Sequence, residues 1–411
     1  MPELLHQPLA PGLGACDLGE LRRRTSEKWA RHGHDVLPAF VAEMDFDVAE
    51  PIRRAVVDSV GRSDLGYPHE GALGAAFSPY AKEMWDWAVA EEHVHACPDV
   101  MTGVATVLTA CTPPGSGVVV NPPVYPPFLF RTEQTDRSVV PVPLVGDDFE
   151  IDLAGLDEAL ARPEVCSYLL CSPHNPLGRV WSREQLLEVA DICQQHGTFL
   201  IVDEIHAPLV MSGAEFVPFL SLDHPMAERA VVFHSASKGW NVPGLKCGLV
   251  VTSSPDVNEA LGARWEALFP SQLGLVATVA AFTADGCRRW LWSALRQLEE
   301  NRRILPELLS AELPGIVWER PQASYLVWLG CEALGLGDDP AAVFLERGRV
   351  ALNRGLDFGE PGRGHVRLNM GTSPAILEEI VVRMAAALRA QEIGTSQPMR
   401  SAISLHVGQS G

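Results

Sequence analysis

The chain has 411 residues, of which 52 are acidic and 32 are basic, so its formal net charge is −20. This acidity favours solubility and argues against nucleic acid or an anionic membrane as the main partner. Hydrophobic residues make up 47% of the chain, which is enough for a large core divided between two domains.

The cysteines and the N-terminus indicate a compartment. The nine cysteines are scattered without a C-x-x-C pair, a pattern typical of free thiols in a reducing environment. The first residues lack a basic region followed by an apolar run, and no apolar stretch reaches the roughly 18 residues of a membrane-spanning helix. We therefore expect a soluble, cytoplasmic protein.

The N-terminal third is predicted to change from irregular to regular structure. Residues 1–50 are polar at first, and we expect them to form an N-terminal arm and part of a small domain. Helical periodicity covers residues 51–62 and 72–90. From about residue 99, short apolar runs alternate with helical patterns, so residues 51–285 are predicted to form a large, cofactor-binding α/β domain with a mostly parallel sheet.

The clearest βαβ unit lies in the middle of the chain. Tyr168–Cys171 is a predicted strand, Ser182–Gln185 resembles a capping box that opens a helix, and residues 198–202 form a buried strand. Ligands of parallel sheets bind beyond the carboxyl ends of the strands. Asn175 and Asp203 fall at such ends, so we expect them to face a ligand.

The C-terminal part has a different texture. A long helix is predicted over residues 288–305, followed by strands over residues 324–328 and 365–369. We assign residues 286–390 to a connecting helix and a small C-terminal domain. Residues 391–411 lose periodicity, so they are predicted to be a disordered tail.

The strongest chemical signal is the stretch that begins at Ser235, just after the predicted strand 231–234. Lys238 can form a Schiff base with an aldehyde, while Ser235, Ser237 and Lys246 can hold a phosphate group. A carboxylate such as Asp203 could pair with a buried pyridinium nitrogen. Together these residues predict pyridoxal phosphate as the cofactor, whereas the serine–lysine motif alone could also be a solvated surface turn.

Eight short motifs in a fixed order give the chain a family resemblance over about residues 22–388. They are Ser26-Glu-Lys-Trp29, Ala42-Glu-Met-Asp-Phe46, Gly66-Tyr67, Pro122-Pro-Val-Tyr125, Ser172-Pro-His-Asn-Pro-Leu-Gly178, Asp203-Glu-Ile-His206, Ser237-Lys-Gly-Trp-Asn241 and Val366-Arg-Leu-Asn369. The chain resembles fold-type I pyridoxal phosphate enzymes of the aspartate aminotransferase superfamily, and most of all the MalY/PatB-type cystathionine β-lyases, or cysteine-S-conjugate C–S lyases. The resemblance implies a large domain with a mostly parallel seven-stranded sheet and a smaller C-terminal α/β domain.

The resemblance also implies roles for single residues. Lys238 and Tyr125 are the expected catalytic residues, with Lys238 holding the cofactor and moving protons and Tyr125 stacking on its ring. Asp203 would face the ring nitrogen and Asn175 the phenolic oxygen. The other expected cofactor contacts are His206, Ser235, Ser237, Lys246 and the backbone amides of Val104 and Ala105, placed at a helix N-terminus where an anion is favoured.

Two further residues are expected to define the assembly and the substrate. Tyr67 matches a tyrosine that reaches the phosphate of the neighbouring subunit, which implies a homodimer with shared active sites. Arg367 interrupts an apolar strand, where an unpaired charge is costly. Its guanidinium fork is expected to bind the α-carboxylate of a small amino-acid substrate.

The expected reaction is a β-elimination that cleaves the C–S bond of cystathionine or another S-substituted L-cysteine and yields a thiol, pyruvate and ammonia. An aminotransferase, or a decarboxylating deaminase of a cysteine conjugate in natural-product biosynthesis, would use the same residues. A regulatory or binding protein on this fold is the alternative of another class, although it would not need Lys238. No G-x-G-x-x-G motif follows a predicted strand, which argues against a dinucleotide-binding dehydrogenase. The histidine pairs His32/His34 and His93/His95 have no acidic or cysteine residues at metal-ligand spacing, so a catalytic metal is not expected.

Overall fold

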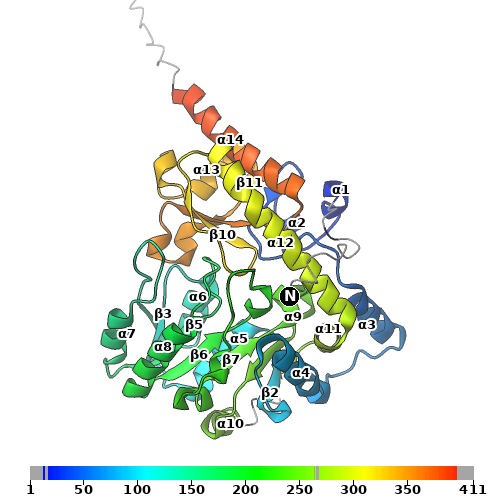
Figure 1. Cartoon of the computed structure of the whole chain (residues 1–411), viewed down its shortest axis with the longest axis vertical. Helices are drawn as coiled ribbons and strands as arrows, with labels where there is room; N and C mark the ends of the chain where they lie inside the picture. The colour runs from blue at the N-terminus through cyan, green and yellow to red at the C-terminus, as the bar shows by residue number, and fades with distance from the viewer. Residues whose placement is uncertain (1–12, 14–16, 263, 265–267, 396–411) are drawn as a thin grey trace, which may run out of the picture.

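The computed structural model describes residue 13 and residues 17–262, 264 and 268–395 (Figure 1). A large sheet lies in the lower half of the view, and a smaller sheet lies above it near the long helix α12. No helix in these ranges is both long and apolar enough to cross a membrane.

The large sheet has seven strands in the order β2-β8-β7-β6-β5-β3-β4. Its strands are β2 (Val94–Cys97), β3 (Gly117–Val120), β4 (Ser138–Pro141), β5 (Val165–Cys171), β6 (Phe199–Asp203), β7 (Val231–His234) and β8 (Gly248–Val251). Only β8 runs antiparallel to its neighbours β2 and β7, and the other pairs are parallel. The predicted mostly parallel seven-stranded sheet is therefore confirmed.

Helices cover both faces of this sheet, because its strands are apolar on both sides. In β3, Val119 packs into one hydrophobic core while Val118 and Val120 pack into another, as expected for a strand with alternating faces. The surrounding helices are α3 (Glu50–Gly61), α4 (Leu73–Trp85), α5 (Val100–Cys111), α6 (Pro126–Gln134), α7 (Leu153–Leu160), α8 (Arg183–His196), α9 (Ala236–Gly239), α10 (Pro255–Leu261) and α11 (Gln272–Thr283).

The predicted capping box is also confirmed. Ser182 accepts the backbone N–H of Gln185, the Gln185 side chain accepts the N–H of Ser182, and α8 begins at Arg183. Gly197 ends the helix in a left-handed conformation with φ of 65°, which glycine adopts at no steric cost.

The smaller sheet joins the two ends of the chain. Strands β12 (Asn353–Arg354), β13 (His365–Asn369), β10 (Leu326–Gly330) and β9 (Val317–Trp318) form an antiparallel sheet, while β1 (Leu37–Pro38) pairs in parallel with β11 (Val350–Ala351). The remaining α-helices are α1 (Leu18–Leu21), α2 (Glu27–Ala30), α12 (Asp285–Glu312), α13 (Pro340–Gly348) and α14 (Pro374–Thr395). Short 3-10 helices are η2 (Glu70–Ala72), η3 (Glu91–His93), η4 (Ala207–Leu209), η5 (Phe219–Ser221), η6 (Pro225–Glu228), η7 (Pro243–Leu245), η9 (Glu332–Leu334), η10 (Gly355–Phe358) and η11 (Glu360–Gly362).

Several predicted boundaries are wrong. The helix predicted to reach residue 90 ends at Trp85, because Asp86 takes a left-handed conformation. Helix α12 is longer than the predicted range 288–305 and continues past Pro306, since Leu305 and Leu309 bury the same face on either side of it. Helix α14 continues to Thr395, and residues 396–411 of the predicted tail lie outside the described residues. The division into domains stays a prediction.

One glycine allows close packing against the turn that carries Lys246. A Cβ on Gly274 of α11 would overlap the carbonyl oxygen of Leu245 and lie 2.7 Å from that of Lys246. We expect Gly274→Ala to lower the free energy of unfolding by about 1–3 kcal/mol, because backbone atoms must shift. Gly61→Ala is the control, since a Cβ there meets nothing within 4 Å. Equal urea unfolding midpoints for the two variants would contradict this packing argument.

Candidate active site

A pocket of about 280 Å³ lies at the carboxyl ends of β5, β6 and β7 and collects most of the predicted site residues. Those that line it are Tyr125, Asn175, Asp203, His206, Ser235, Ser237, Lys238 and Lys246. These ends meet at one edge of the sheet because the three strands are parallel.

Lys238 lies in the short helix α9, and its Nζ donates a hydrogen bond to the carbonyl oxygen of Ala42 at 2.9 Å. Burial, together with the positive charge of Arg367, lowers the pKa of its ammonium group to about 8. An appreciable fraction of Lys238 is therefore a neutral amine near neutral pH, which is the form that attacks a carbonyl carbon.

Asp203 is the last residue of β6, and its carboxylate accepts the backbone N–H of Ile205 at 3.0 Å. Burial raises the pKa of this carboxyl group to about 7, although the charge of Lys238 opposes that shift. No cationic side chain in the described ranges lies within ion-pair distance of it. A buried carboxylate of this kind favours a ligand that brings a positive charge.

Arg367, on β13, does not line the pocket itself but contacts Asn175, which does. Its guanidinium donates to Asn175 Oδ1 at 2.9 Å, to the Phe40 carbonyl at 3.0 Å and to Asn353 Oδ1 at 2.5 Å, and it lies 5.0 Å from the centre of the Phe358 ring. Burial lowers the pKa of this arginine to about 10. All of these acceptors are neutral, and its Nε has no partner in the described part of the chain. The arrangement favours a carboxylate ligand, which would supply the missing charge.

His206 and Tyr125 form other parts of the pocket lining. Burial lowers the pKa of His206 to about 3, so the imidazole is neutral, and its Nδ1 has no hydrogen-bond partner among the residues that the structure describes. Tyr125 precedes α6, and burial raises the pKa of its phenol to about 12. Both rings are therefore uncharged near neutral pH.

A polar group of residues closes the end of the pocket near Lys246. Lys246 Nζ lies 3.1 Å from Asp99 Oδ2, and Asp99 caps α5 by accepting the backbone N–H of Thr102. Ser235 Oγ donates to the Cys247 carbonyl at 2.7 Å and accepts the N–H of Ser237. A cation, hydroxyl groups and the first turn of a helix thus meet here, a combination that suits an anion such as phosphate.

The predicted position of the helix N-terminus is wrong. Helix α5 begins at Val100, and the Gly103 amide already donates to the Asp99 carbonyl. Val104 and Ala105 therefore lie more than one turn into the helix, where their amides belong to the helical hydrogen-bond pattern. Val100 and Met101 line the pocket in their place.

Tyr67 does not meet the other predicted site residues within one chain. Its side chain is 91% exposed, and its ring lies 6.0 Å from that of Phe269, measured between centroids. The predicted contact with a neighbouring subunit stays a prediction.

The residues of the pocket fit pyridoxal phosphate. Asp203 lacks a cationic partner, His206 Nδ1 lacks a hydrogen-bond partner in the described ranges, and Lys238 has a lowered pKa. A pyridinium ring with an aldehyde would meet these needs, and its phosphate would lie near Lys246 and the first turn of α5.

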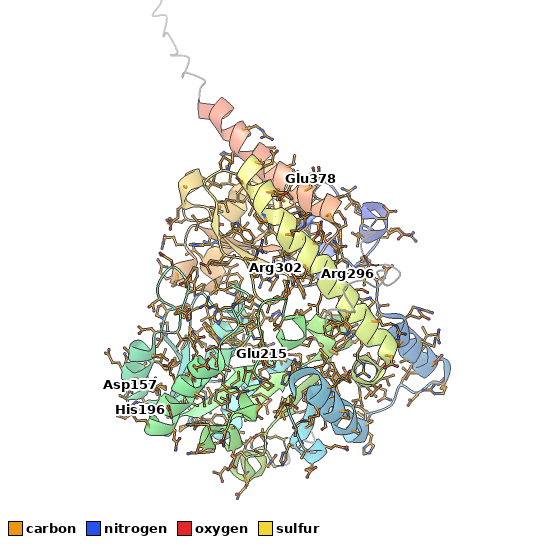
Figure 2. All side chains as sticks on the ribbon, in the orientation of Figure 1. Asp157, His196, Glu215, Arg296, Arg302 and Glu378 are labelled. Atoms are coloured by element: carbon orange, nitrogen blue, oxygen red, sulfur yellow. The ribbon has the colours of Figure 1, made fainter. Side chains whose placement is uncertain are left out.

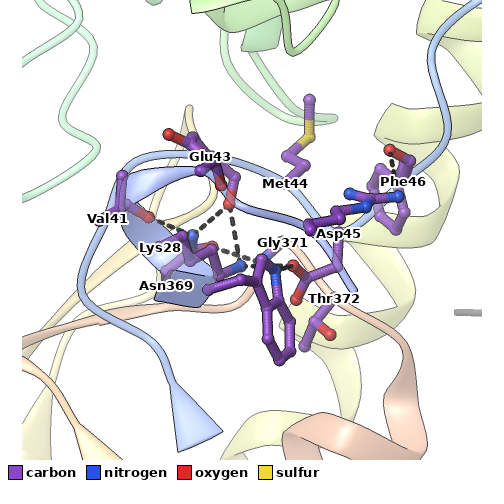
Figure 3. Close-up of polar contacts among 12 residues, drawn as sticks. Lys28, Val41, Glu43, Met44, Asp45, Phe46, Asn369, Gly371 and Thr372 are labelled. Carbon is purple, nitrogen blue, oxygen red and sulfur yellow. Dashed lines mark hydrogen bonds and ion pairs between the residues drawn. The ribbon is translucent and has the colours of Figure 1, made fainter. Parts of the chain in front are cut away.

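The carbonyl that binds Lys238 belongs to a segment held by a buried ion pair (Figure 3). Lys28 Nζ lies 2.8 Å from Asp45 Oδ1, and both side chains are 2% exposed. Lys28 also donates to the Glu43 carbonyl at 3.0 Å, and Trp29 Nε1 donates to Asp45. Two motifs that had no assigned role in the sequence therefore form one polar cluster.

Two asparagines complete the attachment of this segment. Asn241 accepts the N–H of Met44 and donates to its carbonyl, both at 2.7 Å. Asn369 donates to the carbonyls of Val41 and Glu43 at 2.6 Å (Figure 3). The segment is thus tied to the turn after α9 and to the end of β13.

Sequence reasoning missed several residues of the site. Tyr325 donates its hydroxyl to the Ala42 carbonyl at 2.8 Å, the same oxygen that Lys238 binds. Asn353 and Asp99 bind Arg367 and Lys246, respectively. The only signal in the sequence was the presence of Ala42 in a family motif. Tyr325 and Asp99 meet their partners across 283 and 147 residues of chain, and Asn353, 14 residues from Arg367, lies in a two-residue strand too short to show a periodic pattern.

Comparisons with known proteins agree with this fold. Residues 80–384 match the family described as "Aminotransferase class I and II". The chain is 35% identical to the cystathionine beta-lyase PatB of Bacillus subtilis, over 88% of this chain and 96% of PatB. It is 41% identical to a Mycobacterium leprae protein named provisionally as a cystathionine beta-lyase, over 90% and 96% of the two chains. The crystal structure of cystalysin from Treponema denticola, which contains pyridoxal 5'-phosphate, superposes with a TM-score of 0.85 at 26% identity and covers 90% of this chain and 97% of cystalysin.

The buried ion pair predicts a large effect of removing Lys28. Lys28→Met would leave the Asp45 carboxylate buried without its cation, and we expect the free energy of unfolding to fall by about 3–5 kcal/mol. Lys82→Met is the matched control, because Lys82 forms an exposed pair with Asp86 and should contribute about 0–1 kcal/mol. Urea unfolding of both variants checks this, and similar losses would contradict the assignment.

The raised pKa of Asp203 predicts a pH dependence of stability in the cofactor-free protein. The folded state keeps the Asp203 proton up to about pH 7, whereas the carboxyl group has an ordinary pKa of 3.8. Stability should therefore fall as the pH rises from about 4 to about 7, by on the order of 3 kcal/mol from this group.

Asp203→Asn removes this titration, so its stability relative to the wild type should grow over that pH range and then level off. Urea unfolding at a series of pH values measures the difference. A difference that stays constant from about pH 4 to about pH 8 would show that Asp203 ionises normally.

Proposed function

The chain belongs to the class I and II aminotransferase family, and on that premise we propose that it is a pyridoxal phosphate-dependent carbon–sulfur lyase. Its substrate would be cystathionine or another S-substituted L-cysteine, and its products a thiol, pyruvate and ammonia. The names of the relatives above support this reaction. The observation that carries it is the buried guanidinium of Arg367, which has only neutral partners in the described residues and shares a site with Lys238.

When bound, pyridoxal phosphate supplies an aldehyde that condenses with amines and a ring that withdraws electrons from Cα. Lys238 would hold the group covalently, and Asp203 would keep a proton on the ring nitrogen. Tyr125 would stack on the ring, while Asn175 and His206 would contact its polar edge. Ser235, Ser237 and Lys246, with the first turn of α5, would hold the phosphate.

The protein's own residues decide which bond of the substrate reacts. Arg367 binds the α-carboxylate through two parallel hydrogen bonds and so fixes the orientation of Cα. Lys238, whose pKa is near 8, takes the proton from Cα as a general base. The Cβ–S bond then breaks with its electron pair going to sulfur, and the thiolate takes the proton that Lys238 removed from Cα and leaves as a thiol. Hydrolysis of the remaining three-carbon fragment yields pyruvate and ammonia.

We further propose a homodimer in the cytoplasm. Tyr67, Leu65 and Phe269 expose large apolar surfaces, which is typical of a surface that another chain covers. Tyr67 would reach the phosphate of the neighbouring subunit from there. Cysteines in the described part of the chain such as Cys97, Cys171 and Cys193 are free thiols, which fits a reducing compartment.

Purified protein mixed with L-cystathionine tests the reaction directly. We expect pyruvate and a free thiol without added keto acid, and no product from Lys238→Ala. The protein would instead be an aminotransferase if cystathionine and S-substituted cysteines yield no pyruvate and their amino group is transferred to an added keto acid. A carbon dioxide product would indicate a decarboxylating deaminase instead.

The carboxylate site predicts a specific kinetic effect. Arg367→Ala should lower kcat/KM for cystathionine by about 100-fold, mainly through KM, because two charge-assisted hydrogen bonds are lost. Arg354→Ala is the control, since Arg354 lies on the adjacent strand β12 and pairs with Asp339 at 3.0 Å. Steady-state kinetics of both variants measure this, and an unchanged KM for Arg367→Ala would remove the assigned role.

A further inference from the structure

A buried carboxylate–imidazole contact lies directly behind the pocket. Glu204 follows Asp203 in the chain, and His234 precedes Ser235. Glu204 Oε2 lies 2.8 Å from His234 Nε2, and the side chains are 0% and 2% exposed. The two atoms are at ion-pair distance, although they are not aligned as a hydrogen bond. The mechanism above uses neither residue.

Glu204 connects three segments of backbone. Its N–H donates to the Phe233 carbonyl of β7 at 2.9 Å. Its Oε1 accepts the N–H of Phe219, in η5, at 2.7 Å. With the His234 contact, Glu204 therefore holds the end of β6 against the end of β7 and against η5.

Aromatic rings hold the His234 side chain in one position. Trp85 stacks on its imidazole at 5.3 Å with an interplanar angle of 22°, and the rings of Phe77 and Trp87 lie at 5.0 and 5.7 Å. Ring contacts at these distances are attractive and geometrically specific. The imidazole therefore has little freedom to leave Glu204.

We propose that Glu204 and His234 are a positioning pair that fixes the ends of β6 and β7, so that Asp203 and the Ser235–Lys238 turn face each other across the cofactor site. Asp203 and Ser235 line the pocket while their chain neighbours Glu204 and His234 do not, because adjacent residues at a strand end point in opposite directions. The contact between Glu204 and His234, on the side facing away from the pocket, therefore fixes the positions of Asp203 and Ser235 on the side facing it. The inference deepens the proposed function and rests on the proposed cofactor.

The pair also places a charge next to Asp203. The titratable groups that interact with the Asp203 carboxyl group are Lys238, Glu204, Tyr125 and Cys171. Lys238 lowers the pKa of Asp203 and Glu204 raises it. Removing the Glu204 charge should consequently lower the pKa of Asp203, an effect that a purely structural contact would not produce.

The first test measures cofactor affinity in titrations of the cofactor-free protein with pyridoxal phosphate, followed by absorbance. Glu204→Gln keeps an acceptor for Phe219, and His234→Phe keeps a ring among the aromatic residues. We expect each to raise the Kd by about tenfold or more, and the double variant to be no worse than the weaker-binding single variant. The matched control is His196→Phe, because His196 contacts Asp157 at 2.7 Å on the outer helices α7 and α8 (Figure 2) and should leave the Kd within about twofold.

The second test uses the cofactor-free protein alone. In the wild type, the decrease in stability with rising pH that we assign to Asp203 should end at about pH 7. In Glu204→Gln this decrease should end at a lower pH. In the cofactor titration of the first test, His234→Gln, whose amide can donate to Glu204, should recover part of the affinity lost in His234→Phe. The proposal would be overturned if Glu204→Gln changes neither the Kd nor the pH dependence of stability. It would also be overturned if both Glu204→Gln and His234→Gln fail to fold, because the pair would then contribute to stability only. Wild-type protein that binds no pyridoxal phosphate would instead refute the proposed function, while the pH measurement would still test the pair.

Discussion

The pocket depends on the buried ion pair of Lys28 and Asp45, because this pair fixes a segment that has no regular structure of its own. Residues 41–46 belong to no helix or strand, so their backbone groups need other partners. The lysine, two asparagines and Tyr325 supply them. Only then does the Ala42 carbonyl face Lys238, and the N-terminal segment becomes part of a site built mainly by the large sheet.

The site itself concentrates buried charge with few compensating partners. Asp203 and Arg367 are buried and Lys238 is half-buried, and desolvation shifts the pKa of each toward the value that favours its neutral form. Such an arrangement costs folding free energy in the empty protein. A ligand that carries a pyridinium, a phosphate and an α-carboxylate would offset that cost, which explains why stability and binding are linked here.

The sequence predicted the elements whose signals are local. Strand β6, the capped helix α8 and the turn with Lys238 each carry a periodic or capping pattern within a few residues. One error came where tertiary packing overrides that pattern, because helix α12 continues through Pro306 with its buried face packed on both sides of the proline. Another error missed a local signal, since Asp99 caps α5 and the helix begins four residues before Val104.

By itself the sequence determined the order of the βαβ units and the chemistry of Lys238, Asp203 and Arg367, since residue type and strand position are local properties. Only the tertiary structure decided that Ala42, Asn353 and Tyr325 share the site, and that Glu204 and His234 meet behind it. Glu204 and His234 meet because the parallel strands β6 and β7 bring their carboxyl ends to one edge of the sheet. Asn353 reaches Arg367 from the neighbouring antiparallel strand of the small sheet, and Tyr325 binds the Ala42 carbonyl across 283 residues of chain. No pattern in a single sequence specifies which distant side chains meet at such an edge.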